Sequence, residues 1–276
     1  MEPFQLQQAT DVPYLTLNRW EQMDPTLVVG VSARRLQIDE DRLCDNYALH
    51  VQDDPERVRQ NRQQLVDELG FSLSAWTCGN QVHGVHIEQI GIGERGRGNK
   101  LLEDALPATD GLFTREQDIL LTSFYADCVP LLFYSPDKEI IGVAHAGWKG
   151  SVAGIGTKMV NLLNEQGAKH EHLQVAIGPS IGACCYEVDE LVMSPVREQL
   201  GSSCDTIATA TEEGKWRLDL KKFNQELLVR AGVPQKNILC SSYCTSCDEK
   251  LFHSHRASGG KAGRIVVWIG KKGFSP

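Results

Sequence analysis

The stretch ILLTSFYADCVPLLFYSPDKEIIGVAHA, residues 119–146, carries most of the information about the fold. It contains two apolar runs of strand character, separated by the turn sequence Ser-Pro-Asp-Lys at 135–138. Because Pro130 has no N–H to donate to a sheet, we expect it to break the first run and to leave Cys128 near a strand end. The second run ends at His145, so Cys128 and His145 should flank a hairpin on adjacent extended segments.

Amphipathic helices are predicted on both sides of this hairpin. The clearest covers residues 55–69, with Asp54 as the N-cap and Pro55 at the first helical position. A second helix is expected to start near Ser151, and a third to follow Asp219. The other expected elements are extended structure over 74–90, strands near 173–178, 205–218 and 264–270, and a helix near 188–200.

The order of these elements indicates the fold class. Strands and helices mix without a steady βαβ alternation, which favours an α+β fold with layered sheets over a doubly wound sheet. The chain of 276 residues is 41% hydrophobic, enough for an ordinary packed core. No repeat or low-complexity linker divides it, so residues 1–276 are expected to form a single domain.

Charge and composition argue against several classes of function. The net charge is −8 and no basic patch stands out, so a nucleic-acid partner is not expected. The N-terminal residues lack the basic and apolar regions of a signal peptide. No apolar run approaches the roughly 18–20 residues needed to span a bilayer, and we expect a soluble, cytoplasmic protein without a membrane partner. Nine cysteines at irregular spacing suit reduced thiols better than a disulfide framework.

Three residues near turn signals are the main candidates for chemistry: His83, Cys128 and His145. Imidazole and thiolate are good zinc ligands, and three protein ligands leave a fourth position for water or substrate. That number is typical of a catalytic metal site. A cysteine beside a histidine is equally consistent with a nucleophile and its base. Spacing alone leaves both interpretations open, and it does not bring His83 to the other two.

Two further features predict anion binding. Arg62 falls on the apolar stripe of the helix over 55–69, so its charge must be paired or must face a polar cavity, unless its stem merely snorkels to the surface. The glycine-rich turn after His145 leads into a helix start near Gly150–Ser151, where free backbone N–H groups can hold an anion. Lys149 adds a positive charge there.

The other cysteine and acidic motifs are interpreted as structural. Cys244 and Cys247 have metal or redox spacing but lack a second ligand pair nearby, which favours two thiols in a buried loop. Cys184-Cys185 are adjacent and are not expected to ligate one ion together. Asp110, in Thr-Asp-Gly, is most simply a turn or capping residue.

Asp127, next to Cys128, is expected to make structural hydrogen bonds, with the support of a metal ligand as the alternative. The chain also contains two His-x-His pairs, a spacing that favours copper binding. These are His170-Glu-His172 and His253-Ser-His255.

Six motifs occur in order along nearly the whole chain and together carry a specific resemblance. They are Gln-Val-His-Gly (81–84), Thr-Asp-Gly (109–111), Ala-Asp-Cys-Val-Pro (126–130), His-Ala-Gly-Trp-Lys-Gly (145–150), Ile-Gly-Pro-Ser-Ile-Gly-Ala-Cys-Cys-Tyr-Glu-Val (177–188) and Cys-Thr-Ser-Cys-Asp (244–248). This set resembles the YfiH/YlmD family, also called polyphenol oxidase or laccase-domain proteins and now purine nucleoside phosphorylases.

The resemblance implies a fold, a cofactor and an activity. The implied fold is shared with a bacterial deamidase toxin: two packed mixed sheets with helices outside, an α/β/β/α layering. The implied cofactor is one Zn²⁺ held by His83, Cys128 and His145. The implied activities are phosphorolysis of adenosine, inosine, guanosine and methylthioadenosine, and hydrolytic deamination of adenosine. The implied partners are therefore purine nucleosides and phosphate.

The resemblance also implies that Asn46 and Arg62 reach the site, which agrees with the apolar-stripe position of Arg62. Arg62 and the turn at Gly150–Ser151 are then the candidates for the phosphate pocket, with Lys149 standing where the family commonly has Arg. The stretch Phe-His-Ser-His-Arg-Ala at 252–257 departs from the family's usual aromatic-Ser-Tyr-Arg. This departure predicts an altered pocket wall.

Two other activities compete with this one. A cysteine-type amidase using Cys128 and His145, for example on peptidoglycan precursors, is the main alternative, and stoichiometric zinc would distinguish the two. A multicopper laccase needs roughly ten histidines, largely in His-x-His pairs. The chain has eight histidines, so copper-dependent polyphenol oxidation is disfavoured.

Overall fold

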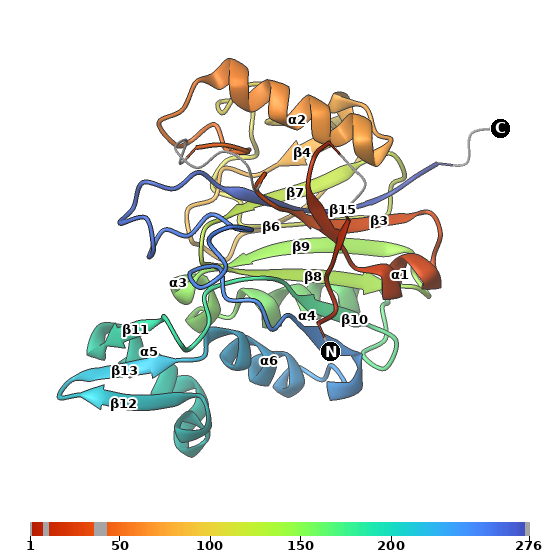
Figure 1. Cartoon of the computed structure of the whole chain (residues 1–276). Helices are drawn as coiled ribbons and strands as arrows, with labels where there is room; N and C mark the ends of the chain where they lie inside the picture. Colours follow the sequence, from red (N-terminus) through yellow and green to blue (C-terminus); the bar gives the residue numbers. More distant parts are fainter. Residues whose placement is uncertain (1, 8–10, 36–42, 274–276) are drawn as a thin grey trace.

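The computed structural model describes residues 2–7, 11–35 and 43–273, which form two large mixed β-sheets packed together (Figure 1). The first sheet has the strand order β1-β2-β3-β15-β7-β4 and the second has the order β14-β10-β8-β9-β6-β5. The strands of the first sheet are β1 (Gln5–Gln7), β2 (Tyr14–Thr16), β3 (Leu27–Ser32), β4 (Trp76–Cys78), β7 (Leu120–Tyr125) and β15 (Ile265–Lys271). Those of the second are β5 (Ile87–Gln89), β6 (Gly111–Thr114), β8 (Val129–Ser135), β9 (Ile140–Ala146), β10 (Gln174–Ile177) and β14 (Ile238–Cys240).

The apolar hairpin sequence joins the two sheets. Strand β7 lies in the first sheet, whereas β8 and β9 are neighbours in the second, so the connection at 126–128 carries the chain from one sheet to the other. The expected return strand ending at His145 is confirmed by β9. The predicted break at Pro130 was misplaced, because Pro130 lies inside β8, opposite His145. Its carbonyl accepts the N–H of Gly178, just beyond the last β10 pair, so the missing N–H falls where that ladder ends.

Burial on both faces explains why these strands read as continuous apolar runs. In β8, Leu132 packs between the two sheets, while its neighbours Leu131 and Phe133 pack on the outer face against helices. In β7, Leu121 likewise faces the other sheet and Leu120 faces outward. Each strand therefore contributes to two separate apolar layers.

Helices cover the outer faces of both sheets (Figure 1). Helix α2 (Pro55–Leu69) packs on the first sheet and matches its predicted bounds, with the Asp54 carboxylate accepting the N–H of Glu56 at 2.9 Å. On the second sheet lie α4 (Ile155–Glu165), α5 (Glu190–Leu200) and α6 (Leu220–Arg230). Short helical segments complete the set: α1 (Asn18–Met23), α3 (Trp148–Val152), and 3₁₀ turns at Leu73–Ala75, Ile92–Glu94, Gly201–Thr206 and Gln235–Asn237.

The helix expected near Ser151 is two helices. Gly154 adopts φ 80°, a left-handed conformation that ends α3 and lets α4 start in a new direction. Ser151 lies in the middle of α3, and its backbone N–H already donates to the carbonyl of Gly147. The N-terminus of this short helix is therefore three residues earlier than the sequence pattern indicated.

A small third sheet stands apart from the main body. It has the order β11-β13-β12, formed by β11 (Glu187–Asp189), β12 (Ala208–Glu212) and β13 (Lys215–Leu218). Figure 1 shows it at the lower left, beside α5. Within the described ranges, no helix is long and apolar enough to cross a membrane.

Arg62 is a structural centre of the α2 side. Its guanidinium is fully buried and donates to the carbonyls of Tyr47, Gly98 and Asn99 at 2.8–2.9 Å. It also lies 5.0 Å from the ring centroids of both Trp76 and Phe124. Burial lowers the pKa of Arg62 to about 10, which leaves it charged at neutral pH. One side chain thus connects α2, the loop at 47 and the loop at 98–99.

We predict that Arg62→Lys lowers the free energy of unfolding by roughly 2 kcal/mol or more. An ammonium lacks the planar fork of N–H donors with which the guanidinium bonds all three carbonyls. Arg59→Lys, on the same helix in an ion pair with Glu56, is the matched control and should change it by less than about 1 kcal/mol. Denaturant midpoints measure the difference. Equal midpoints for the two variants would show that the buried guanidinium contributes nothing beyond its charge.

Candidate functional site

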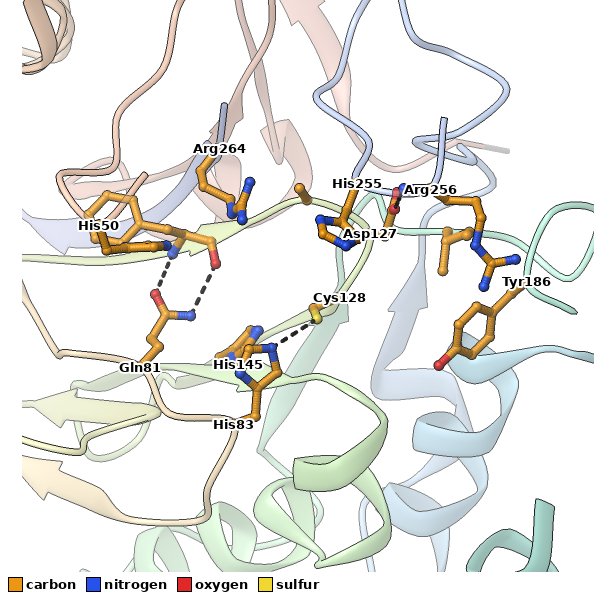
Figure 2. A pocket seen from close by; sticks show the side chains of 13 residues that line it. His50, Gln81, His83, Asp127, Cys128, His145, Tyr186, His255, Arg256 and Arg264 are labelled. Carbon is orange, nitrogen blue, oxygen red and sulfur yellow. Dashed lines mark hydrogen bonds between the residues drawn. The ribbon is translucent and has the colours of Figure 1, made fainter. Parts of the chain in front are cut away.

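Two of the three candidate residues lie on connections at which the chain passes between the two sheets, and the third lies at the end of a strand. His83 lies in the loop from β4 in the first sheet to β5 in the second. Cys128 lies in the turn from β7 to β8, which makes the same crossing. His145 is the penultimate residue of β9, next to β8. The prediction from spacing could not bring His83 to the other two, but the paired crossings do so (Figure 2).

The donor atoms of this triad converge. One ligand atom from each of His83, Cys128 and His145 lies within 4.8 Å of the others. The Cys128 Sγ to His83 Nε2 distance is 3.9 Å, and the two imidazole rings meet edge to face with centroids 4.7 Å apart. His145 is buried, Cys128 is half-buried and His83 is exposed. Two nitrogens and one sulfur at this separation form a donor set that fits a single transition-metal ion, with one side open to solvent.

The Asp110 carboxylate organises two members of the triad. It accepts the His145 Nδ1–H at 2.9 Å, so the Nε2 of that ring is left for the cavity side. It also accepts the backbone N–H groups of Val82, His83 and Gly84 at 2.9–3.0 Å. Burial raises the pKa of Asp110, but these hydrogen bonds outweigh it and hold the pKa below its ordinary value. The interpretation of Asp110 as a turn residue missed this role.

The place of Asp110 in the sequence identifies its partner only once the pairing of the strands is known. It directly precedes β6, and β6 pairs with β9 so that Gly111 lies opposite Ala144. The backbone N–H of His145 donates to the Asp110 carbonyl at 2.7 Å, which brings the two residues side by side. Without the pairing of β6 with β9, the Thr-Asp-Gly motif does not identify its partner.

The electrostatics of the triad favour a charge-separated pair. Burial raises the pKa of the Cys128 thiol, but the charge of His145 and hydrogen bonds from His145 and His83 outweigh it, giving a pKa of about 6. Burial lowers the pKa of His145, but the Cys128 thiolate and Asp110 raise it to about 9. In the absence of a metal, a thiolate beside an imidazolium is thus the stable state near neutral pH.

Backbone shape allows the close approach of these groups. A Cβ on Gly147 would lie 2.9 Å from His83 Cδ2 and 3.0 Å from Cys128 Sγ, so only glycine leaves room at this position. His83 and Asp127 both adopt positive φ angles, 61° and 82°, which are uncommon for residues with side chains. The Asp127 carboxylate accepts hydrogen bonds from Thr245 Oγ1 at 2.6 Å and from the Arg256 N–H at 2.7 Å. Structural hydrogen bonding by Asp127 is confirmed.

A cavity of about 440 Å³ opens beside the triad. Burial, followed by the charges of Arg264 and Arg62, lowers the pKa of His50 to about 4, so His50 is neutral at pH 7. The polar lining of the cavity comprises His50, Gln81, His83, Asp127, Cys128, His145, Tyr186, His255, Arg256 and Arg264 (Figure 2).

Arg264 brings a positive charge to this lining, and sequence reasoning did not identify it. Its Nη1 donates to the carbonyls of Ala262 and Gly263 at 2.7 and 3.0 Å. Its backbone N–H donates to the Asn46 Oδ1 at 2.9 Å. Asn46 is itself fully buried, and its amide nitrogen donates to Ala48 and Asp53. Asn46 therefore lies behind the cavity and fixes the backbone that carries Arg264.

Four other expected contacts do not line the cavity. Arg62 lies behind Phe124, with its guanidinium occupied by three carbonyls. Lys149 is exposed, and its ammonium lies 5.7 Å from the Trp148 ring. Gly150 and Ser151 are buried inside α3, where the Ser151 hydroxyl donates to the Ala146 carbonyl and accepts from Asn224.

A second group of metal-ligand type contradicts the expectation for the remaining cysteines. Cys184, Cys185, Cys244 and Cys247 meet with their sulfur atoms within 4.8 Å of one another. Among the described residues, these four and the triad are the only such groups of three or more, so neither His-x-His pair joins one. Of the second pair, His255 faces the cavity and His253 is buried away from it.

Comparisons with known proteins agree with this architecture. Residues 30–272 match the family model described as multi-copper polyphenol oxidoreductase laccase. The chain is 42% identical over 232 residues to the purine nucleoside phosphorylase YlmD of Geobacillus stearothermophilus, covering 82% of this chain and 83% of that protein. It is 40% identical over 228 residues to the purine nucleoside phosphorylase YlmD of Bacillus subtilis, covering 82% of each chain.

Solved structures of similar proteins have the same fold. The crystal structure of YlmD from Geobacillus stearothermophilus superposes with a TM-score of 0.92 at 37% identity, covering 99% of this chain and 100% of that one. The crystal structure of the Bacillus licheniformis hypothetical protein YfiH gives 0.91 at 37% identity, with the same coverage. Two packed mixed sheets are thus common to all three. The chain belongs to the multi-copper polyphenol oxidoreductase laccase family, and within it resembles the YlmD and YfiH proteins.

Proposed function

We propose that this protein is a zinc-dependent purine nucleoside phosphorylase whose active site is the cavity beside His83, Cys128 and His145. The observation that carries the proposal is the convergence of three metal-ligand atoms on a cavity that is also lined by two arginines, Arg256 and Arg264. The names of two relatives at 40–42% identity support the reaction class. Adenosine, inosine, guanosine and methylthioadenosine are the proposed substrates, with phosphate as the second substrate.

The donor set supports zinc as the metal. His145 directs its Nε2 away from Asp110, Cys128 offers a low-pKa thiol, and His83 completes a three-ligand set. A bound zinc ion supplies Lewis-acid polarisation of a substrate atom at its open position. Copper is less well supported, because the His-x-His pairs contribute no ligand to the triad.

In phosphorolysis the bond from ribose C1′ to the purine nitrogen breaks, a phosphate oxygen bonds to C1′, and the purine leaves with a proton. The phosphate therefore has to lie beside the ribose and opposite the leaving base. We assign this contact to Arg264, because its guanidinium lines the cavity while Arg62 and Lys149 lie outside it. Arg256 also lines the cavity, but both of its Nη atoms donate to the carbonyls of Cys185 and Glu187. A guanidinium suits a phosphate because its N–H groups can donate two parallel hydrogen bonds. Asn46 and Arg62 then support the wall from behind.

The same cavity is proposed to deaminate adenosine. Water adds to the purine C6, the bond from C6 to the amino nitrogen breaks, and ammonia and inosine are the products. The common zinc deaminases combine a His-x-Glu motif with Pro-Cys-x-x-Cys, and the second of these motifs is absent from this sequence, so this activity would use an unrelated site.

A second candidate function rests on one specific observation. Cys128, His145 and Asp110 form a thiol, imidazole and carboxylate relay of the type found in cysteine hydrolases. Such an amidase would need neither a third metal-ligand residue nor a metal ion. The presence of His83 within reach of both other ligands favours the metal site.

We predict that His83→Ala, Cys128→Ala and His145→Ala each abolish zinc binding at the triad and reduce phosphate-dependent release of base from adenosine or inosine by at least about 100-fold. Removing zinc from the wild-type protein with a chelator should have the same effect, and adding zinc back should restore turnover. Product masses and metal content measure both. Full phosphate-dependent turnover by metal-free protein would contradict the proposed zinc dependence.

We predict that Arg264→Gln raises the KM for phosphate by roughly 10-fold to 100-fold, because a charged hydrogen-bonded contact contributes about 1.5–3 kcal/mol. The KM for the nucleoside should change much less. Initial rates at varied phosphate measure the effect, and Arg115→Gln, an exposed arginine that donates to the Gln166 carbonyl, controls for net charge. If Lys149→Gln raised the KM for phosphate and Arg264→Gln did not, phosphate would have to bind at the turn before α3.

We predict that Asp110→Asn weakens zinc binding by roughly 10-fold to 100-fold, because the carboxylate that orients His145 and the loop at 82–84 becomes a poorer acceptor. Asp137→Asn is a matched control, since Asp137 also faces a histidine, His172, at 3.5 Å but far from the triad. Competition with a chelating dye measures the affinity. Identical affinities for the two variants would exclude a role for Asp110 in supporting the metal.

A further inference from the structure

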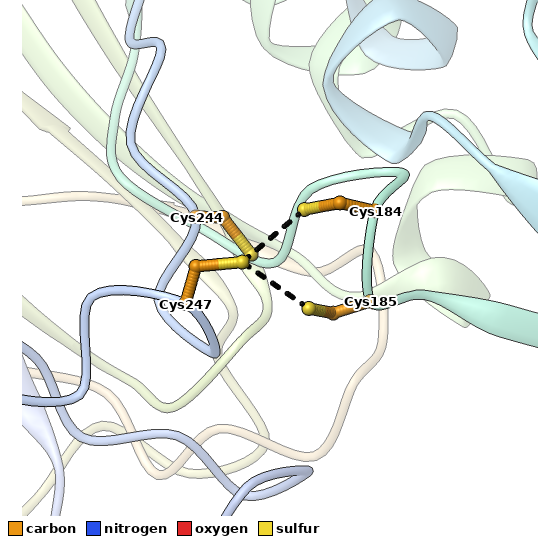
Figure 3. Close-up of side chains that lie close together, drawn as sticks. All are labelled: Cys184, Cys185, Cys244 and Cys247. Atoms are coloured by element: carbon orange, nitrogen blue, oxygen red, sulfur yellow. Dashed lines mark hydrogen bonds between the residues drawn. The ribbon is translucent and has the colours of Figure 1, made fainter.

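Four of the eight cysteines outside the triad lie on two loops that leave the same end of the second sheet. Strands β10 and β14 are parallel neighbours, so the loop that begins at Gly178 and the loop that begins at Ser241 start side by side. The first carries Cys184 and Cys185, and the second carries Cys244 and Cys247 (Figure 3). This pairing supplies the second ligand pair that the sequence pattern lacked.

Backbone contacts hold the two loops together. Ser180 and Cys244 form an isolated parallel bridge, and the N–H of Thr245 donates to the Ser180 carbonyl at 3.1 Å. The N–H of Gly182 donates to the Cys244 sulfur at 3.1 Å. Backbone N–H groups directed at a cysteine sulfur stabilise negative charge on it, as a metal thiolate requires.

The sulfur positions resemble a tetrahedron more than a disulfide. Cys247 Sγ lies 3.5 Å from Cys184 Sγ and 3.4 Å from Cys185 Sγ, and all four sulfurs lie within 4.8 Å of one another. Four sulfurs bound to zinc at about 2.3 Å would be roughly 3.8 Å apart. A disulfide needs about 2.05 Å and would use only two of the four. Since Cys247 is almost equally close to both members of the adjacent pair, no single disulfide accounts for the arrangement.

We propose that Cys184, Cys185, Cys244 and Cys247 form a second metal site that binds one structural Zn²⁺ through four thiolates. Four protein ligands close the coordination sphere and leave no position for substrate, which is typical of a structural site. An all-sulfur tetrahedral set selects zinc or iron among the common metals, and redox-inactive zinc suits a purely structural position. The thiol protons are released as the four Zn–S bonds form, and no electron transfer is involved.

This metal would brace one wall of the active-site cavity. Arg256, which lines the cavity, donates from its side chain to the carbonyl of Cys185 at 2.9 Å. Asp127, next to Cys128, accepts a hydrogen bond from Thr245, which lies next to Cys244. Tyr186 follows Cys185 directly and also lines the cavity. A four-cysteine site thus fixes the loops that place these side chains, while remaining separate from the triad.

Metal content per chain tests the proposal on the full-length protein purified with zinc. Wild type should contain two zinc ions, Cys247→Ser about one, and Cys128→Ala about one. Cys240→Ser removes a half-buried cysteine outside both groups and should retain two. An unchanged zinc content in Cys247→Ser, or a single zinc ion in wild type that Cys128→Ala removes, would overturn the second site. The count does not depend on nucleoside turnover, so its failure is distinct from failure of the proposed reaction.

A second test identifies the atoms bound to the zinc ion, and it does not require that a variant of the cluster folds. X-ray absorption of zinc-loaded Cys128→Ala, in which the cluster is intact, should show sulfur ligands alone at about 2.3 Å. Nitrogen or oxygen neighbours would contradict a four-thiolate site. Intact mass under non-reducing conditions should show no loss of two hydrogens, and a disulfide between Cys247 and either adjacent cysteine would also overturn it. Iron in place of zinc in the native protein would overturn the assignment of the metal.

Discussion

The site depends on one carboxylate, that of Asp110. It accepts the N–H groups of three successive residues in the His83 loop and the Nδ1–H of His145, so it holds two ligands in one frame. Four donors compensate for the burial of a negative charge, which is otherwise costly. The same hydrogen bonds set which nitrogen of His145 is free. The proposed metal binding depends on this arrangement, because these hydrogen bonds hold His83, in a loop, and His145, in a strand, close enough to bind one ion.

The position of the site follows from how the chain connects its two sheets. The connections β4–β5 and β7–β8 both pass from the first sheet to the second. Strands β4 and β7 are parallel neighbours, so both connections leave the first sheet at the same edge. Cys128 and His83 therefore come together, with Cys128 Sγ 3.9 Å from His83 Nε2. The cavity opens beside them, and Arg264, just before the last strand, also lines it.

Much of the local structure was predictable from sequence. Helix 55–69 and the return strand to His145 follow from periodicity, capping and turn signals. The triad residues were candidates by residue type, and only the family resemblance joined them into one site. The contacts that were not predictable all depend on which strands become neighbours. Asp110 meets His145 only because β6 pairs with β9, and Cys184 meets Cys247 only because β10 pairs with β14. Arg62 shows a further limit: its apolar-stripe position required a polar partner, but the pattern could not distinguish backbone carbonyls from a ligand pocket.

The crossing of the chain between the sheets also constrains the order of folding. Each of the three ligands is supplied by a segment distant in sequence from at least one other, so no local fragment contains the whole site. We expect contacts of this kind to form late in folding. Closing long loops costs conformational entropy, and only the packing of the two sheets compensates for that cost. A metal ion that binds all three ligands recognises only the docked pair of sheets, and by mass action it stabilises their docking. Metal binding by the triad therefore indicates that the two sheets have docked and that the molecule has folded.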